Sequence, residues 1–121
     1  MLDRLEVSDG GRVIYSSLSD ADLAATGTLS SHSEGLIDLL AQSDTAEVAI
    51  LFKEDGPSAT RVSVRTKPGG VDATVLTGAF GGGGHARAAG ATVEAPLAEA
   101  RTQVLAVAER LATAVDRPQL A

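Results

Sequence analysis

A run of four glycines followed by a histidine is the segment of this 121-residue sequence best suited to binding a ligand. Glycines at 81–84 let a ligand approach the backbone without a Cβ atom in the way, and they let backbone N–H groups converge on an anion. The imidazole of His85 adds a donor that can become cationic next to a phosphate. An apolar segment ending at Phe80 precedes the run, and Ala88-Ala-Gly90 follows it. A flexible linker does not require such small and apolar neighbours, so the sequence favours an ordered functional loop.

The alternating segment 60–66 offers side chains that suit a phosphate group. Its period of two places the valines on one face of a strand and Ser63 and Arg65 on the other, with Lys67 continuing that row. A guanidinium can hold a phosphate through two hydrogen bonds, and hydroxyls add neutral donors. A strand–turn–helix–loop return can bring this strand and the glycine run to one edge of a sheet. The alternative is a solvated strand face that forms an ion pair.

Several other kinds of chemistry are excluded. The absence of cysteine rules out disulfides, thiolate nucleophiles and Cys-rich zinc sites. The only histidines are His32, to which we assign no function, and His85. The glycine run fits neither the dinucleotide-binding pattern nor the Walker pattern, and no triad or pair of acids stands out. We therefore assign no catalytic and no metal-binding residue to this chain.

The charge of the chain is unevenly distributed. The formal net charge is −6, which argues against a long nucleic acid or an anionic membrane as partner. Residues 61–87 nevertheless carry four basic side chains against one acid, a net of +3, which leaves −9 for the rest. Only three aromatic residues are present, too few for a base-stacking platform. No apolar run is long enough to span a membrane, and the acidic start lacks the apolar region of a signal peptide, so we expect a cytoplasmic protein.

Strand and helix signals alternate along the chain. Strands are expected at 12–16, 47–53, 60–66 and 91–93, and helices at 19–26, after a capping box at 31–34, after Asp72, and between Pro96 and Pro118. The near-continuous apolar segment 47–53 is typical of a central strand covered on both faces. The pattern predicts a single α/β domain over residues 1–121, with a four- to five-stranded, mostly mixed sheet and helices packed on it.

Three segments together resemble the DHH-associated C-terminal domain of the DHH-family phosphoesterases. They are 61–67, the short helix opened by Asp72, and the segment 80–90, which reads FGGGGHARAAG. The resemblance is greatest to the nanoRNase/pAp-phosphatase type, the bifunctional oligoribonucleases, and segments 33–36 and 47–53 are also similar to that subfamily. It extends over nearly the whole chain. Thr66 stands where the family commonly has serine, which preserves a hydroxyl.

This resemblance implies a substrate-recognition domain. In the family, an N-terminal DHH domain binds two manganese ions, and the C-terminal domain holds the nucleotide at the cleft between the two domains. The metal-binding residues are absent here, so we expect no cofactor on this domain and no hydrolysis by this chain alone. The partners implied are the DHH catalytic domain and a short oligoribonucleotide or phosphonucleotide. The substrate-binding residues implied are Arg65, Gly82, Gly83, Gly84 and His85, with Ser63, Thr66 and Lys67 as helpers.

The absence of the catalytic domain leaves two interpretations. The chain is either a piece of a manganese-dependent phosphoesterase or a free-standing, non-catalytic nucleotide-binding or regulatory module, for example for a cyclic dinucleotide. An Asp-His-His-containing domain encoded upstream of Met1 favours the first. A third interpretation is an RNA-binding appendage like those of synthetase-type proteins, which the acidic balance and the scarcity of aromatic residues disfavour.

Overall fold

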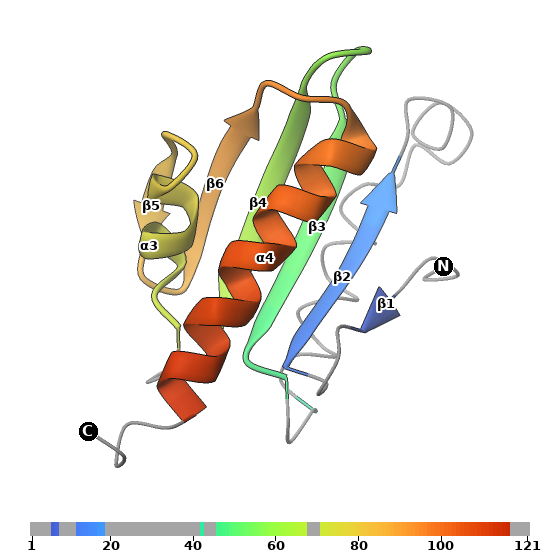
Figure 1. Ribbon diagram of the computed structural model, residues 1–121. Helices are drawn as coiled ribbons and strands as arrows, with labels where there is room; N and C mark the ends of the chain where they lie inside the picture. The colour runs from blue at the N-terminus through green and yellow to red at the C-terminus, as the bar shows by residue number, and fades with distance from the viewer. Residues whose placement is uncertain (1–5, 8–11, 19–41, 43–45, 68–70, 117–121) are drawn as a thin grey trace.

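The structure is a computed structural model that describes residues 6–7, 12–18, 42, 46–67 and 71–116. Its strands are β1 (Glu6–Val7), β2 (Val13–Leu18), β3 (Val48–Glu54), β4 (Thr60–Thr66), β5 (Gly83–His85) and β6 (Ala88–Val93), and its helices are α3 (Ala73–Gly78) and α4 (Leu97–Asp116). The strands form one sheet in the order β1-β2-β3-β4-β6-β5 (Figure 1). Strands β2 and β3 run parallel, and the other described pairs are antiparallel. The predicted α/β class and mixed sheet are confirmed, with the two-residue β1 added at one edge.

Most of the predicted elements in the described residues lie where the sequence placed them. The expected strands at 12–16, 47–53 and 60–66 correspond to β2, β3 and β4, and the helix after Pro96 is α4. Two expectations were wrong in detail: the glycine run is not entirely loop, because it contains β5, and the strand expected from residue 91 begins at Ala88. The helices expected at 19–26 and after 31–34 lie outside the described residues.

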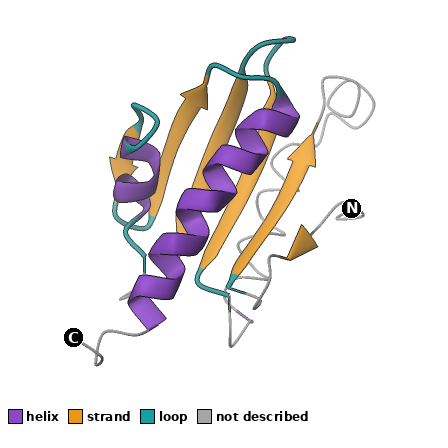
Figure 2. Ribbon diagram, in the orientation of Figure 1, coloured by secondary structure: helices purple, strands orange, loops and turns teal. Residues whose placement is uncertain are grey.

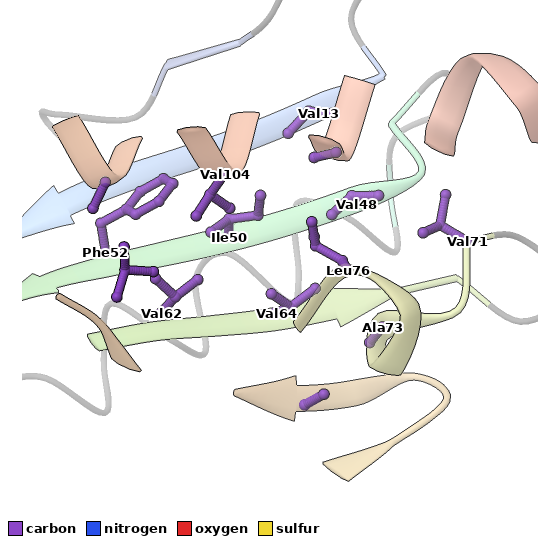
Figure 3. Packing of buried hydrophobic residues seen from close by; sticks show 14 of the residues in the cluster. Val13, Val48, Ile50, Phe52, Val62, Val64, Val71, Ala73, Leu76 and Val104 are labelled. Atoms are coloured by element: carbon purple, nitrogen blue, oxygen red, sulfur yellow. The ribbon is translucent and has the colours of Figure 1, made fainter. Parts of the chain in front are cut away.

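The main core lies between the sheet and the two helices, which cover the same face (Figure 2). Strand β3 is central, and Val48 to Phe52 are all buried, as expected for a strand covered on both faces. In Figure 3, Ile50 and Phe52 of β3 lie next to Val104 of α4, and Val64 of β4 lies next to Leu76 of α3. The remaining buried residues of α4 are Ala100, Ala108 and Ala112. Their small side chains allow the helix to lie close to the sheet.

Helix α4 is amphipathic rather than apolar throughout. Its buried residues recur at every fourth position, and Glu99, Gln103 and Arg110 are exposed between them. None of the helices in the described part of the chain is both long and apolar enough to cross a membrane.

Helix α3 is short because both of its ends are fixed by local signals. Asp72 is the N-cap, as predicted, and its carboxylate accepts a hydrogen bond of 2.8 Å from the backbone N–H of Thr74. Hydrogen bonds from Thr74 lower the pKa of the Asp72 carboxyl below its ordinary value. The bond from the Thr74 hydroxyl has the larger effect, and the bond from the Thr74 backbone N–H has the smaller one. At the other end, Gly81 has φ +80°, a conformation that stops the helix and favours glycine. The helix therefore delivers the chain into β5 directly after its last turn.

Candidate functional site

The sheet has a second face, turned away from α4, that is only partly covered. On this face the β2–β3 half is closed, with Ile14, Ala49 and Leu51 buried. The half formed by β4, β6 and β5 is accessible, and we call it the open face. Its residues are Arg61, Ser63 and Arg65 of β4, Ala88, Gly90 and Thr92 of β6, and Gly83 and His85 of β5.

The strand register aligns the candidate residues of β4 and β5 across β6. Arg65 and His85 both pair with Ala88, so they lie in one row on the open face, one on each side of a methyl group. Two interstrand spacings place their backbones about 10 Å apart. Ser63 and Gly83 form the next row, with Gly90 between them. The structure thus brings together the strand arginine and the glycine–histidine segment, which the sequence places twenty residues apart.

The glycines of the run differ in what surrounds them. A Cβ atom on Gly84 would lie 2.6 Å from Ala89 Cα and 2.7 Å from Ala88 O, and one on Gly82 would collide with Gly90 O. Both glycines are therefore required by the close approach of this segment to β6. Gly83 has nothing within 4 Å of the corresponding position and faces open space. Of the three glycines implied in substrate binding, Gly83 is on the open face, whereas Gly82 and Gly84 pack against β6.

The first two N–H groups of the run are already used inside the domain. Gly81 N–H donates to Gly78 O at 3.1 Å, and Gly82 N–H donates to Thr77 O at 2.9 Å. Both bonds satisfy carbonyl groups at the end of α3. These two N–H groups are therefore not free to converge on an anion.

Thr66 holds the β5–β6 hairpin in place. It is buried on the helix side of β4, opposite to Arg65, and its hydroxyl donates to Ala86 O at 3.2 Å. Ala73 N–H donates to the same carbonyl at 2.6 Å, and Thr66 N–H donates to Arg87 O at 3.1 Å. Three hydrogen bonds thus fix the turn that follows His85. Thr66 is a positioning residue in this arrangement, away from the open face.

Lys67 lies just beyond the end of β4 and is half-buried, with its N–H donating to Glu47 O at 3.2 Å. It therefore sits past the Arg65 row, near the start of β3. His85 is exposed and Ser63 is half-buried, so both are accessible on the open face. Within the described part of the chain, no group of His, Asp and Glu side chains is arranged to hold a metal ion.

Replacing Thr66 by valine is expected to lower the free energy of unfolding by about 1 kcal/mol, because a part-buried hydrogen bond to the hairpin turn is lost. Urea unfolding measures this, and the amide resonances of Ala86 and Arg87 should shift. Thr102→Val is the matched control, since it removes a 3.1 Å hydroxyl–carbonyl bond on the exposed surface of α4 and should change stability by less than about 0.5 kcal/mol. Equal effects of the two substitutions would contradict the positioning role.

The side-chain charge on the open face is positive. Arg61 and Arg65 come from β4, and neither β4, β5 nor β6 presents a carboxylate on this face. The Arg65 guanidinium donates to Val64 O at 3.0 Å, which occupies one of its five N–H donors. A phosphate placed between Arg65 and His85 would accept hydrogen bonds from both sides. The arrangement is thus suited to binding an anion.

A hollow of about 230 Å³ extends the open face toward the other end of β4. It is lined by Arg61, Val62 and Ser63 of β4 and by Gly90, Ala91 and Thr92 of β6. Arg61 belongs to the basic segment 61–87 but is not among the substrate-binding residues that the resemblance implied. The period of two already puts Arg61 on the same face as Ser63 and Arg65, and this is the signal that could have added it to the site.

These features define an α/β domain whose sheet leaves a cationic, glycine-containing face open. The family model of the DHHA1 domain matches residues 10–114, so the chain belongs to the DHHA1 domain family. This confirms the resemblance to the DHH-associated domain.

Solved structures share the fold at low sequence identity. An exopolyphosphatase-related protein from Bacteroides fragilis aligns with a TM-score of 0.77 and 20% identity, over 96% of this chain and 34% of that one. A pGpG-specific phosphodiesterase from Vibrio cholerae gives 0.53 and 15%, over 93% and 35%. The C-Ala domain of Aquifex aeolicus alanyl-tRNA synthetase gives 0.59 and 15%, over 88% and 95%. The chain thus spans about a third of the first two proteins and nearly all of the third.

Proposed function

We propose that this domain recognises the phosphate and nucleotide of a short oligoribonucleotide or phosphonucleotide, as the accessory domain of a cytoplasmic DHH-family phosphoesterase. The row formed by Arg65 and His85 carries the proposal, because it places two donors on either side of a single methyl group. A guanidinium binds phosphate through paired hydrogen bonds, and an imidazole N–H can donate a further hydrogen bond to the same group.

The charge distribution supports a small ligand over a long one. The net charge of −6 repels an extended polyanion, while the open face presents arginines without a neighbouring carboxylate on its own strands. A short phosphorylated ligand experiences chiefly the local field, because salt screens charges beyond about 8 Å at physiological ionic strength. Binding is thereby restricted to ligands that fit the open face.

Membership of the DHHA1 family and the names of two fold relatives point in the same direction. One relative is described as exopolyphosphatase-related and the other as a pGpG-specific phosphodiesterase, and both names concern phosphorylated substrates. In our proposal, a DHH catalytic domain supplies the hydrolytic chemistry and its two manganese ions, and this domain supplies substrate contacts. The nanoRNase/pAp-phosphatase type is the subfamily that we propose.

Arg65→Ala and His85→Ala are expected to weaken binding of a nucleoside monophosphate, by about tenfold for Arg65, which corresponds to the loss of a charge-assisted hydrogen bond. Titration at low salt, followed by amide chemical shifts, measures the dissociation constants even when binding is weak. The shifts should be largest at Ser63, Arg65 and His85.

Arg110→Ala is the matched control, since it removes the same charge from the exposed side of α4 and should leave binding within about twofold. If the Arg65 and His85 variants bind the nucleotide as well as the parent does, the site assignment is wrong. A parent chain with no shifts on the open face leads to the same conclusion.

A further inference from the structure

The open face extends along β4 well beyond the row formed by Arg65 and His85. Arg65 and Arg61 are four residues apart on β4 and face the same way, which separates them by about 13 Å along the strand. Arg61 lies at the hollow formed with Gly90 and Thr92, beyond the row that contains Ser63. The open face therefore has two cationic positions, one at each end.

The hollow exists because β6 carries no side chain at Gly90. A Cβ atom there would lie 3.2 Å from Val62 O, so the position is already close to β4 and any side chain would fill the space. Thr92, which pairs with Arg61 across the β4–β6 ladder, also lines the hollow and carries a hydroxyl. The lining thus combines a guanidinium, two hydroxyls and backbone, which suits a polar or anionic group better than an apolar one.

The cationic character of this end is reinforced from β3. Lys53 pairs with Arg61 across the β3–β4 ladder, so two positive side chains lie next to each other. Burial lowers the pKa of Lys53, the Arg61 guanidinium lowers it further, and the Asp55 carboxylate partly opposes both effects. Two like charges on neighbouring strands are stabilised when an anion binds between or beside them.

We propose that the open face binds a ligand longer than one nucleotide, with one phosphate between Arg65 and His85 and a second phosphate at the hollow beside Arg61. This inference rests on the proposed function and adds the length of the ligand. A nucleoside monophosphate has a single phosphate and can occupy only one end. A trinucleotide has further phosphates along its backbone and can reach both ends.

The experiment compares a nucleoside monophosphate with a 5′-phosphorylated RNA trinucleotide on the full chain, over a range of salt concentrations. Arg61→Ala should weaken trinucleotide binding by about tenfold and change monophosphate binding by less than about twofold. It should also reduce the slope of log K against log salt by about 0.7 for the trinucleotide, the value expected for one lost phosphate contact on a single strand. Arg65→Ala should weaken both ligands, and Arg110→Ala neither.

The Lys53 side-chain pKa gives a second measurement that does not need a variant. Binding of the trinucleotide should raise this pKa, because a phosphate at the hollow favours the charged ammonium, and binding of the monophosphate should not. Nuclear magnetic resonance of the lysine side chain follows this titration.

The outcomes separate this inference from the proposed function. If Arg61→Ala affects both ligands equally, or neither, the second subsite is wrong while the Arg65–His85 site stands, and the hollow is then better regarded as a contact for a protein partner. If Arg65→Ala leaves monophosphate binding unchanged, the proposed function itself fails. A parent chain that binds neither ligand overturns both.

Discussion

Gly84→Ala is expected to lower the free energy of unfolding by about 3 kcal/mol, or the melting temperature by roughly 10 °C, whereas Gly83→Ala should change stability by no more than about 0.5 kcal/mol. The two glycines are neighbours in the same strand, so their local sequence context is almost identical. They differ in the space that a side chain would meet.

The reason for the difference is the approach of β5 to β6. Gly84 has φ +145°, which L side chains rarely adopt, and a methyl group there would press on Ala88 O and on the Cα atom of Ala89. Relief requires β5 to move away from β6, which breaks the hairpin that carries His85. Gly83 faces open space, and alanine there also restricts the unfolded chain.

Thermal and urea unfolding of both variants measure the stability effect, and nucleotide titration adds a functional one. Gly83→Ala places a methyl group on the open face next to the His85 row. Because this methyl group meets open space, the variant should fold normally, and because it occupies the proposed site, the variant should bind nucleotide more weakly. Equal stability of the two variants would show that the close packing against β6 is not formed. Unchanged binding by Gly83→Ala would remove Gly83 from the site.

Leu76→Ala should cost about 3 kcal/mol, because Leu76 is fully buried and its loss leaves a cavity between α3, the sheet and α4. Helix α3 has only six residues, fewer than two turns, so it depends on this contact more than on its own hydrogen bonds. Its last carbonyls accept the N–H groups of Gly81 and Gly82. Hydrogen exchange at residues 81–85 should therefore accelerate more than exchange in β3.

Val75→Ala is the control for this prediction. Val75 is the adjacent residue of α3 and is 53% exposed, so its truncation removes little packing. Alanine is also the better helix former, and the variant should be as stable as the parent or more stable by up to about 0.5 kcal/mol. If Leu76→Ala lowers the free energy of unfolding no more than Val75→Ala does, the packing of α3 against the core is contradicted. The midpoints of urea unfolding measure the stability of both variants, provided that the dependence of the unfolding free energy on urea concentration stays the same.

Local features of the site could be predicted from the sequence where one physical rule governs them. The alternation at 60–66 separated Ser63 and Arg65 from the valines, because one side of β4 is buried under the helices and the other is open. The same alternation places Thr66 with the valines, so its buried position could have been foreseen. Asp72 as a helix N-cap was also correct, since its carboxylate can reach a free N–H group of the first turn.

The register between strands could not be predicted in the same way. The row that joins Arg65, Ala88 and His85 depends on how β6 aligns with two other strands at once. If the pairing register between β5 and β6 were shifted by one residue, the His85 side chain would face the helices. The separate roles of Gly83 and Gly84 have the same origin, because only the distance to β6 distinguishes two glycines that are identical in sequence terms. Contacts between distant segments set both features.

The small residues of β6 have a consequence for selectivity. Ala88 and Gly90 offer a ligand a methyl group and bare backbone, and none of the described residues of the open face carries a carboxamide or a carboxylate. Carboxamides and carboxylates recognise adenine and cytosine edges, and the two arginines, which could recognise guanine, are assigned to phosphates in our proposal. The His85 ring can stack on a base, but stacking accepts every base. We therefore expect the proposed site to select a ligand by the number and spacing of its phosphates and to depend little on its base composition.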